Sequence, residues 1–268
     1  MSEYNTYSTI DKSSYSNPNE VKVNHIHLDW IIDFDAKIIK GSCLQSCEVI
    51  IDSTETVNLD SRSLSISSVL INKNPVTYKV DEETKALGSK ISVTIPSELR
   101  SKGTAFDLEF IYSQSTDASA VQWLDKEATA GGKYPYVFTQ CQAIHARSLL
   151  PCQDAPGTKI PYTAKVTAPE WSTVLMSALL EPSNEKGVFY FKQVIPVSTY
   201  LIALAAGNLA SREISERSRV WSEPEVVDAA LFEFSETEGI IYSHITVSVH
   251  NKIYYLLLIN IIRFLKNC

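Results

Sequence analysis

The sequence has little positive charge and no run of five or more like charges. Its 24 lysines and arginines stand against 31 aspartates and glutamates, which gives a formal net charge of −7. Nucleic-acid binding needs clustered basic side chains that contact phosphates. The charge pattern therefore excludes nucleic acid as an expected partner.

The sequence also lacks the patterns of a secretory leader and of a disulfide framework. The first twenty residues, MSEYNTYSTIDKSSYSNPNE, are polar and serine-rich, without a basic start and an apolar core. No Asn-x-Ser/Thr glycosylation signal occurs in the 268 residues. An odd and dispersed set of cysteines favours reduced thiols over disulfides, and we therefore expect a cytoplasmic protein. The five cysteines are Cys43, Cys47, Cys141, Cys152 and Cys268.

No apolar run is long enough to predict a transmembrane helix. The run IYYLLLINIIRFL, residues 253–265, is nearly continuous, but Arg263 interrupts it. It is about 13 residues long, whereas a bilayer needs about 20. We interpret residues 239–268 as an apolar tail that is unrelated to the rest of the chain. Large exposed apolar patches often mark interfaces, so we expect self-association through this tail.

Before residue 220, apolar residues almost never recur at the spacing of a helix. They recur at every second position instead. From Ile26 to Phe34 every even position is apolar, which is typical of a half-buried strand. Short strand-like runs separated by turn residues continue along the chain and predict a mainly β fold. We expect a flexible arm over residues 1–19 and a β domain over 20–208. The further strand-like runs are 47–52, 56–72, 72–80, 90–96, 105–113, 162–169, 172–179, 187–196 and 200–207.

A helix is predicted after the β domain, in SEPEVVDAALFEFS (residues 222–235). Ser222 stands where an N-cap belongs, and Glu225 completes a capping box three residues later. Pro224 falls in the first turn, where a missing N–H costs little. We therefore expect the helix to begin at Ser222.

The stretch QCQAIHARSLLPCQDAPGTK, residues 140–159, concentrates the residue types that carry chemistry. Cys141, His145 and Cys152 could bind zinc, but no second close pair completes a four-ligand set. Cys141 and His145 could form a nucleophile and its base, but no orienting Asn or Asp is evident. Two buried thiols and a structural histidine are the interpretation that we favour. Asp154, before Ala155-Pro156, is predicted to form a turn.

The longer segment WLDKEATAGGKYPYVFTQCQAIHARSLLPCQDAPGTKIPYTAKVTAP resembles the zinc aminopeptidases that include leukotriene A(4) hydrolase and its eukaryotic aminopeptidase relatives. The resemblance covers about residues 20–238 and continues through STYLIALAAGNLASREISERSRVWSEPEVVDAALFEFSETE. It implies a saddle-like N-terminal β domain followed by a catalytic and a helical domain. It also implies hydrolysis of the N-terminal residue of peptides and, in one branch, of an epoxide.

The chain departs from that family at the motifs that carry catalysis. Family members bind zinc through a His-Glu-x-x-His helix and a later glutamate, and a Gly-x-Met-Glu-Asn loop binds the substrate amine. No histidine of this chain is followed by glutamate, and neither Met1 nor Met176 precedes Glu-Asn. We therefore expect a truncated and inactive member without a zinc cofactor of its own. In this interpretation residues 209–238 are the start of a truncated catalytic domain.

The resemblance assigns a role to the start of the 140–159 stretch. In the family this loop reaches over the catalytic cleft and helps to line the pocket for the first residue of the peptide. The matching positions here are Gln140, Gln142 and Ala143, and Tyr134 and Tyr136 are expected to pack near them. A neutral amide can both donate and accept hydrogen bonds, which suits a peptide N-terminus. Two alternatives stay open: the amides satisfy only the loop backbone, or the chain is a non-catalytic module that binds a protein partner.

Overall fold

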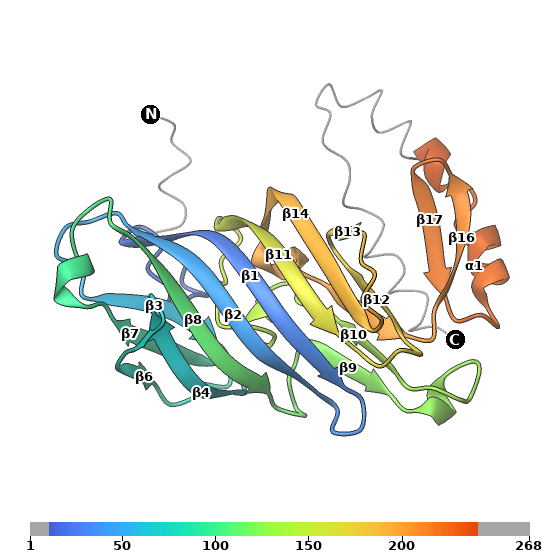
Figure 1. Cartoon of the computed structure of the whole chain (residues 1–268), viewed down its shortest axis with the longest axis horizontal. Helices are drawn as coiled ribbons and strands as arrows, with labels where there is room; N and C mark the ends of the chain where they lie inside the picture. The colour runs from blue at the N-terminus through green and yellow to red at the C-terminus, as the bar shows by residue number, and fades with distance from the viewer. Residues whose placement is uncertain (1–10, 241–268) are drawn as a thin grey trace.

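The computed structural model of the protein describes residues 11–240 and has the mainly β fold expected from the sequence. Its largest unit is a twisted eight-stranded sheet, in which long central strands are flanked by the short edge strands β13 and β5 (Figure 1). Strands β1 and β11 pair in parallel, and the other strand pairs of this sheet are antiparallel. In spatial order the strands are β13 (Leu179–Glu181), β14 (Val188–Ser198), β11 (Lys159–Thr167), β1 (Val21–Asp33), β2 (Ile38–Val49), β8 (Ala105–Gln114), β4 (Leu64–Ile71) and β5 (Asn74–Pro75).

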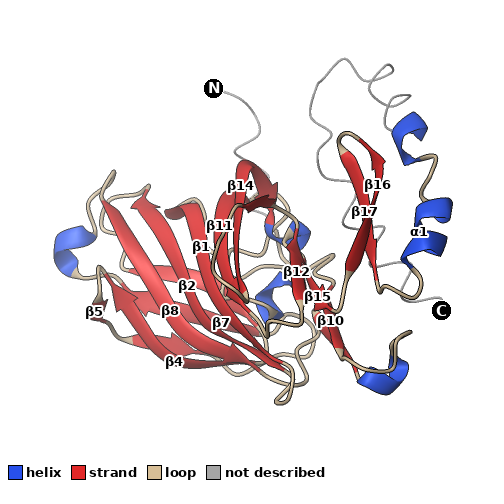
Figure 2. Ribbon diagram, turned by 45° about the vertical axis from the view of Figure 1, so that its right-hand side comes forward, coloured by secondary structure: helices blue, strands red, loops and turns tan. Residues whose placement is uncertain are grey.

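Two smaller sheets and a hairpin complete the fold. One sheet has the order β3 (Thr56–Ser61), β7 (Ser89–Thr94), β6 (Tyr78–Val80). The other has the order β12 (Thr173–Met176), β15 (Leu204–Gly207), β10 (Tyr136–Thr139), β9 (Val121–Leu124). Figure 2 shows the hairpin β16 (Ala210–Ser215) and β17 (Ser218–Ser222) beside the helix α1 (Val227–Glu233), at one side of the molecule. Single 3-10 turns lie at Ser97–Leu99, Lys126–Ala128, Ala146–Ser148 and Thr199–Leu201.

The alternation predicted for β1 is confirmed, and it fixes which face of the large sheet is buried. Ile26, Leu28 and Trp30 are fully buried, whereas the odd positions face outward. A register shift between Val23 and His25 moves the buried positions from odd to even. The Trp30 indole donates a hydrogen bond to the Tyr112 hydroxyl at 2.9 Å, so its polar atom is satisfied inside the core. Each buried apolar side chain of this size contributes about 1.5–3 kcal/mol.

The main core lies between the large sheet and the two small sheets. Val57 and Leu59 of β3 belong to the same buried cluster as Trp30, and so does Val137 of β10. The sheets therefore fold as one body, and the loop that follows β10 is anchored to the main core.

The expected helix start is wrong. Ser222 ends β17, where it pairs with Ala210 and is buried, and α1 begins only at Val227. The N-cap position is Val226, which makes no side-chain capping bond. Pairing along the hairpin holds Ser222 in an extended conformation, so the local capping box cannot form. Strands β9, β10, β16 and β17, residues 38–46 of β2 and residues 180–181 of β13 were not predicted.

Part of the predicted N-terminal arm is packed against β3. The Asn17 side chain donates to Thr56 O at 3.0 Å and accepts from Asn58 N at 2.7 Å. Residues 1–10 of the arm and residues 241–268 of the predicted tail lie outside the described residues. Within residues 11–240, no helix is long and apolar enough to cross a membrane.

Candidate functional site

The three predicted substrate-binding positions lie together on the loop after β10. Gln140, Gln142 and Ala143 are exposed, whereas Cys141 between them is buried. The Gln140 backbone N–H donates to Ala120 O at 2.7 Å, and its side-chain Oε1 accepts from Gln142 N at 3.1 Å. The Gln142–Ala143 peptide bond is cis. The loop thus turns two side-chain amides toward solvent while its cysteine points into the core.

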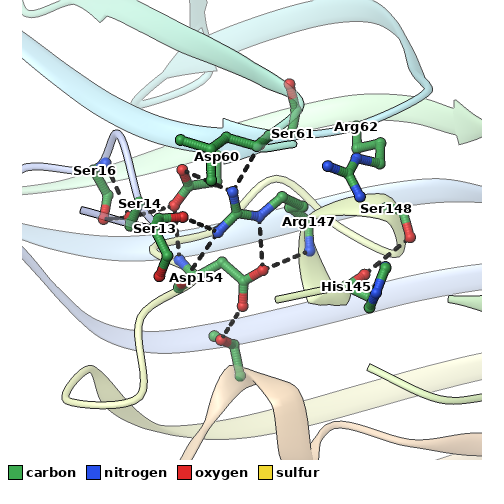
Figure 3. A network of polar contacts seen from close by, with 12 residues as sticks. Ser13, Ser14, Ser16, Asp60, Ser61, Arg62, His145, Arg147, Ser148 and Asp154 are labelled. Carbon is green, nitrogen blue, oxygen red and sulfur yellow. Dashed lines mark hydrogen bonds and ion pairs between the residues drawn. The ribbon is translucent and has the colours of Figure 1, made fainter. Parts of the chain in front are cut away.

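A buried arginine holds the chain immediately after this loop (Figure 3). Arg147 is fully buried, and its Nε donates to Asp154 Oδ2 at 2.9 Å. Its Nη1 donates to Leu87 O at 2.7 Å, and its Nη2 donates to Ser13 O at 2.8 Å. The Asp60 carboxylate lies 3.7 Å from Nη1. One guanidinium therefore joins the loop to the N-terminal arm, to β3 and to the turn before β7.

The two carboxylates of this network have further donors. Asp154 accepts from the Thr199 hydroxyl at 2.8 Å. Asp60 accepts from Ser14 Oγ at 2.5 Å, from Tyr15 N at 2.7 Å and from Asp154 N at 3.1 Å. Burial raises the pKa of Asp60 above its ordinary value, while Arg147 and these hydrogen bonds act in the opposite direction. A buried ion pair is tolerated when hydrogen bonds satisfy its remaining polar atoms, and this one meets that condition.

Asp154 therefore has a different role from the turn former predicted for it. It is 2% exposed and is the direct partner of Arg147. Arg147 and Asp60 were missed by the sequence reasoning. One signal was available, because Arg147 stands among the apolar residues Ala146, Leu149 and Leu150, and a charged residue in an apolar run needs a buried partner.

The zinc and nucleophile interpretations of the same stretch find no support in the geometry. Cys141 and Cys152 are fully buried, and desolvation raises the pKa of both thiols, against what a nucleophile requires. His145 is hydrogen-bonded through Nδ1 to Ser119 Oγ at 2.8 Å, and burial lowers its pKa. Within residues 11–240, no three His, Cys, Asp or Glu side chains come together in a way that could hold a metal.

The two tyrosines upstream of the loop occupy different surroundings. Tyr136 is buried in β10, where a Cβ on Gly207 would come within 2.4 Å of its ring. Gly207 is therefore needed for β15 to approach the strand that leads into the loop. Tyr134 stacks on Trp171 with ring centroids 4.6 Å apart. Trp171 also contacts Phe34, with centroids 4.9 Å apart, so Tyr134 belongs to a separate aromatic group.

Comparisons with known proteins agree on one family. Residues 13–201 match the Peptidase M1 N-terminal domain. The chain is 36% identical over 235 residues to leukotriene A-4 hydrolase of Xenopus laevis, which covers 85% of this chain and 38% of that protein. It is 38% identical over 231 residues to leucine aminopeptidase 2 of Lodderomyces elongisporus, which covers 84% of this chain and 34% of that protein.

The solved structure of native yeast LTA4 hydrolase has the same fold over the matched part. The TM-score is 0.82 at 30% identity, and the match covers 88% of this chain and 37% of that chain. The chain thus spans well under half the length of the relatives that it matches. Because the matched domain occupies most of the sequence, the chain belongs to the M1 peptidase family and carries the family's N-terminal domain.

Proposed function

We propose that this chain provides the substrate-side loop of an M1 aminopeptidase and has no peptidase activity by itself. The observation that carries the proposal is the exposure of Gln140, Gln142 and Ala143 on a loop that is followed directly by a buried network. Amide side chains of this kind can accept from the α-ammonium group of a peptide and donate to its first carbonyl. In this proposal the loop contacts the first residue of the substrate, and a separate domain hydrolyses the peptide bond.

The rigidity of the loop's base supports this role. Binding groups contribute most when their positions are fixed before the ligand arrives, because less conformational entropy is then lost. Here Gln140 N is bonded to Ala120 O, and Arg147 is held by Asp154 and by two backbone carbonyls. The exposed amides therefore project from a segment that is fixed at both ends.

In this proposal the residues of this chain do not bind the catalytic zinc of the family. The sequence contains no His-Glu-x-x-His motif, and the described residues hold no set of three suitable ligands. A catalytic zinc needs three protein ligands and an open position for water. The donor groups of residues 11–240 do not form such a centre.

A chimera tests the role of the loop. Residues 1–222 of this chain would replace the matching part of leucine aminopeptidase 2 of Lodderomyces elongisporus, and the hydrolysis of aminoacyl-anilides would be measured. We expect Gln140→Ala and Gln142→Ala to raise KM severalfold, because each removes a polar contact to the substrate. Asn184→Ala is the matched control, since Asn184 is an exposed amide in the loop between β13 and β14. An active chimera whose KM and kcat are unchanged by both glutamine substitutions would contradict the proposal.

The cytoplasm is the location that we propose for this chain. Four of its cysteines, Cys43, Cys47, Cys141 and Cys152, are buried free thiols. Thiols persist unpaired in a reducing compartment. Fractionation of cells that express the tagged chain would test this, and recovery in a secreted fraction would contradict it.

A second candidate function is a non-catalytic interaction module that associates with itself. Strand β13 ends the large sheet, and its residues Leu179 and Leu180 are 69% and 54% exposed. The apolar run of residues 253–265, outside the described residues, adds to the apolar character of the chain. Deleting residues 239–268 should shift the protein toward monomer in size-exclusion chromatography. A full-length chain that already elutes as a stable monomer would contradict this candidate.

A further inference from the structure

Two histidines of β1 converge on one threonine of β11, on the outward face of the large sheet. His27 Nδ1 lies 2.8 Å from Thr163 Oγ1, and His25 Nε2 lies 3.5 Å from the same oxygen. Strands β1 and β11 lie side by side (Figure 1), and His27 and Thr163 are direct partners in their parallel pairing. The two imidazoles therefore direct a nitrogen toward the same point.

The local structure of β1 explains this convergence. Residues two apart on a strand project from the same face, about 6–7 Å apart along the strand. The register shift between Val23 and His25 lies directly before the pair, and such bulges redirect the neighbouring side chains. Both histidines are half-buried, so part of each ring is open to solvent.

We propose that His25 and His27 bind a late first-row divalent cation such as Cu²⁺, Ni²⁺ or Zn²⁺. Imidazole nitrogen is a preferred ligand for these ions, and affinity at a given site is highest for Cu²⁺. The cation would take the place between the two rings that the Thr163 hydroxyl now faces, with water at its remaining positions. This site is separate from the loop at residues 140–143 and does not depend on the function proposed for that loop.

The protonation of His25 suits a metal ligand. Burial, and secondarily the neighbouring His27, lower the pKa of His25, so its ring is neutral at pH 7. A neutral imidazole has the lone pair that coordination needs. The cross-strand pairing brings four acidic and three basic side chains to the surrounding face, a balance that does not oppose a cation. They are Lys22 and Asp29 of β1, Glu48 of β2, Asp107 and Glu109 of β8, Lys165 of β11 and Lys192 of β14.

The test is metal titration of the purified full-length chain. Calorimetry with Cu²⁺ and with Zn²⁺ gives affinity and stoichiometry, and electron paramagnetic resonance of the Cu²⁺ form counts the coordinating nitrogens. We expect one site with two imidazole nitrogens. His25→Ala and His27→Ala should each weaken binding by more than the roughly tenfold that the loss of a group supporting a ligand costs, and should leave one imidazole nitrogen on the copper. His145→Gln is the matched control, because His145 is bonded to Ser119 and should leave the site unchanged.

Two results would overturn the proposal. One is wild-type affinity in the double variant with both histidines replaced by alanine, which would place the metal elsewhere. The other is a copper spectrum without two imidazole nitrogens in the wild-type chain. Circular dichroism establishes that each variant is folded, and His25→Gln and His27→Gln replace the alanine variants if those do not fold. Release of the metal at pH 5 and rebinding at pH 7.5 is expected if the ligands are imidazoles.

Discussion

The Arg147 guanidinium donates through Nε to Asp154 Oδ2 at 2.9 Å, and both side chains are almost completely buried. Arg147 lies four residues after Ala143, the last of the exposed positions of the loop. The same arginine reaches the backbone of Leu87 and of Ser13. The segment that carries the candidate site is therefore held by contacts with residues far away in the sequence.

Replacing this arginine should destabilise the domain strongly. Arg147→Met leaves Asp60 and Asp154 buried without their countercharge, and removing one partner of a buried pair costs about 3–5 kcal/mol. Arg212→Met is the matched control, because Arg212 pairs with Asp228 at an exposed position, where such pairs contribute about 0–1 kcal/mol. Urea denaturation measures the free energy of unfolding of both variants. Equal losses for the two variants would show that the buried network is not a main source of stability.

The N-terminal arm should contribute to the same network. Deleting residues 1–16 removes Ser13 O from Arg147, and it removes the Ser14 hydroxyl and Tyr15 N–H from Asp60. Hydrogen bonds to charged groups contribute about 1.5–3 kcal/mol each, so the loss of three should lower the free energy of unfolding by about 4.5 kcal/mol or more. Deleting only residues 1–10 removes none of these three bonds and is the control. If both deletions unfold at the same urea concentration, the arm does not act through Asp60 and Arg147.

Gly41 should be intolerant of any side chain. It pairs with Trp30 across the β1–β2 hairpin, and an added Cβ would lie 1.9 Å from Asp29 O. Gly103 also has a positive φ, but nothing lies within 4 Å of its Cβ position. Gly41→Ala should therefore cost about 1–3 kcal/mol more than Gly103→Ala, which is the usual cost of overpacking. Equal melting temperatures for the two variants would contradict this account of the hairpin.

Stability should decrease as the solution becomes acidic, partly because of two histidines. Burial lowers the pKa of His25 and of His145 below the ordinary value of 6.5. The folded chain thus binds fewer protons at these sites than the unfolded chain, so the stabilisation is present above pH 6.5 and is lost as pH falls through the lowered values. The double variant His25→Gln/His145→Gln should show a weaker dependence in urea unfolding between pH 7.5 and 5.5. If the free energy of unfolding depends on pH equally in the wild type and in the variant, this prediction is wrong.

The strands of the main core could be predicted from the sequence because their signal is local. Ile26, Leu28 and Trp30 alternate with polar residues, and one buried face requires that pattern. The exposed positions Gln140 and Gln142 were also found, although through the family resemblance and not through any physical pattern. Their role in binding stays a prediction.

The rest depended on tertiary partners, most of which are distant in sequence. Asp154 precedes an Ala-Pro turn, and only the fold shows that Arg147, Asp60 and Thr199 surround it. Ser222 and Glu225 have the residue types and spacing of a capping box, but Ser222 pairs with Ala210 and belongs to β17. Tertiary pairing overrides local propensity in such cases, and the apolar neighbours of Arg147 were the one local sign of the buried pair.

The most direct measurement of the central claim is the aminopeptidase activity of the purified 268-residue chain. Hydrolysis of leucine and alanine anilides would be followed with and without added Zn²⁺, and with leucine aminopeptidase 2 of Lodderomyces elongisporus as the positive control. Because the sequence has no His-Glu-x-x-His motif, we predict no turnover above the buffer rate under either condition, even if Zn²⁺ binds at His25 and His27. Turnover that a chelator abolishes and Zn²⁺ restores would contradict the account.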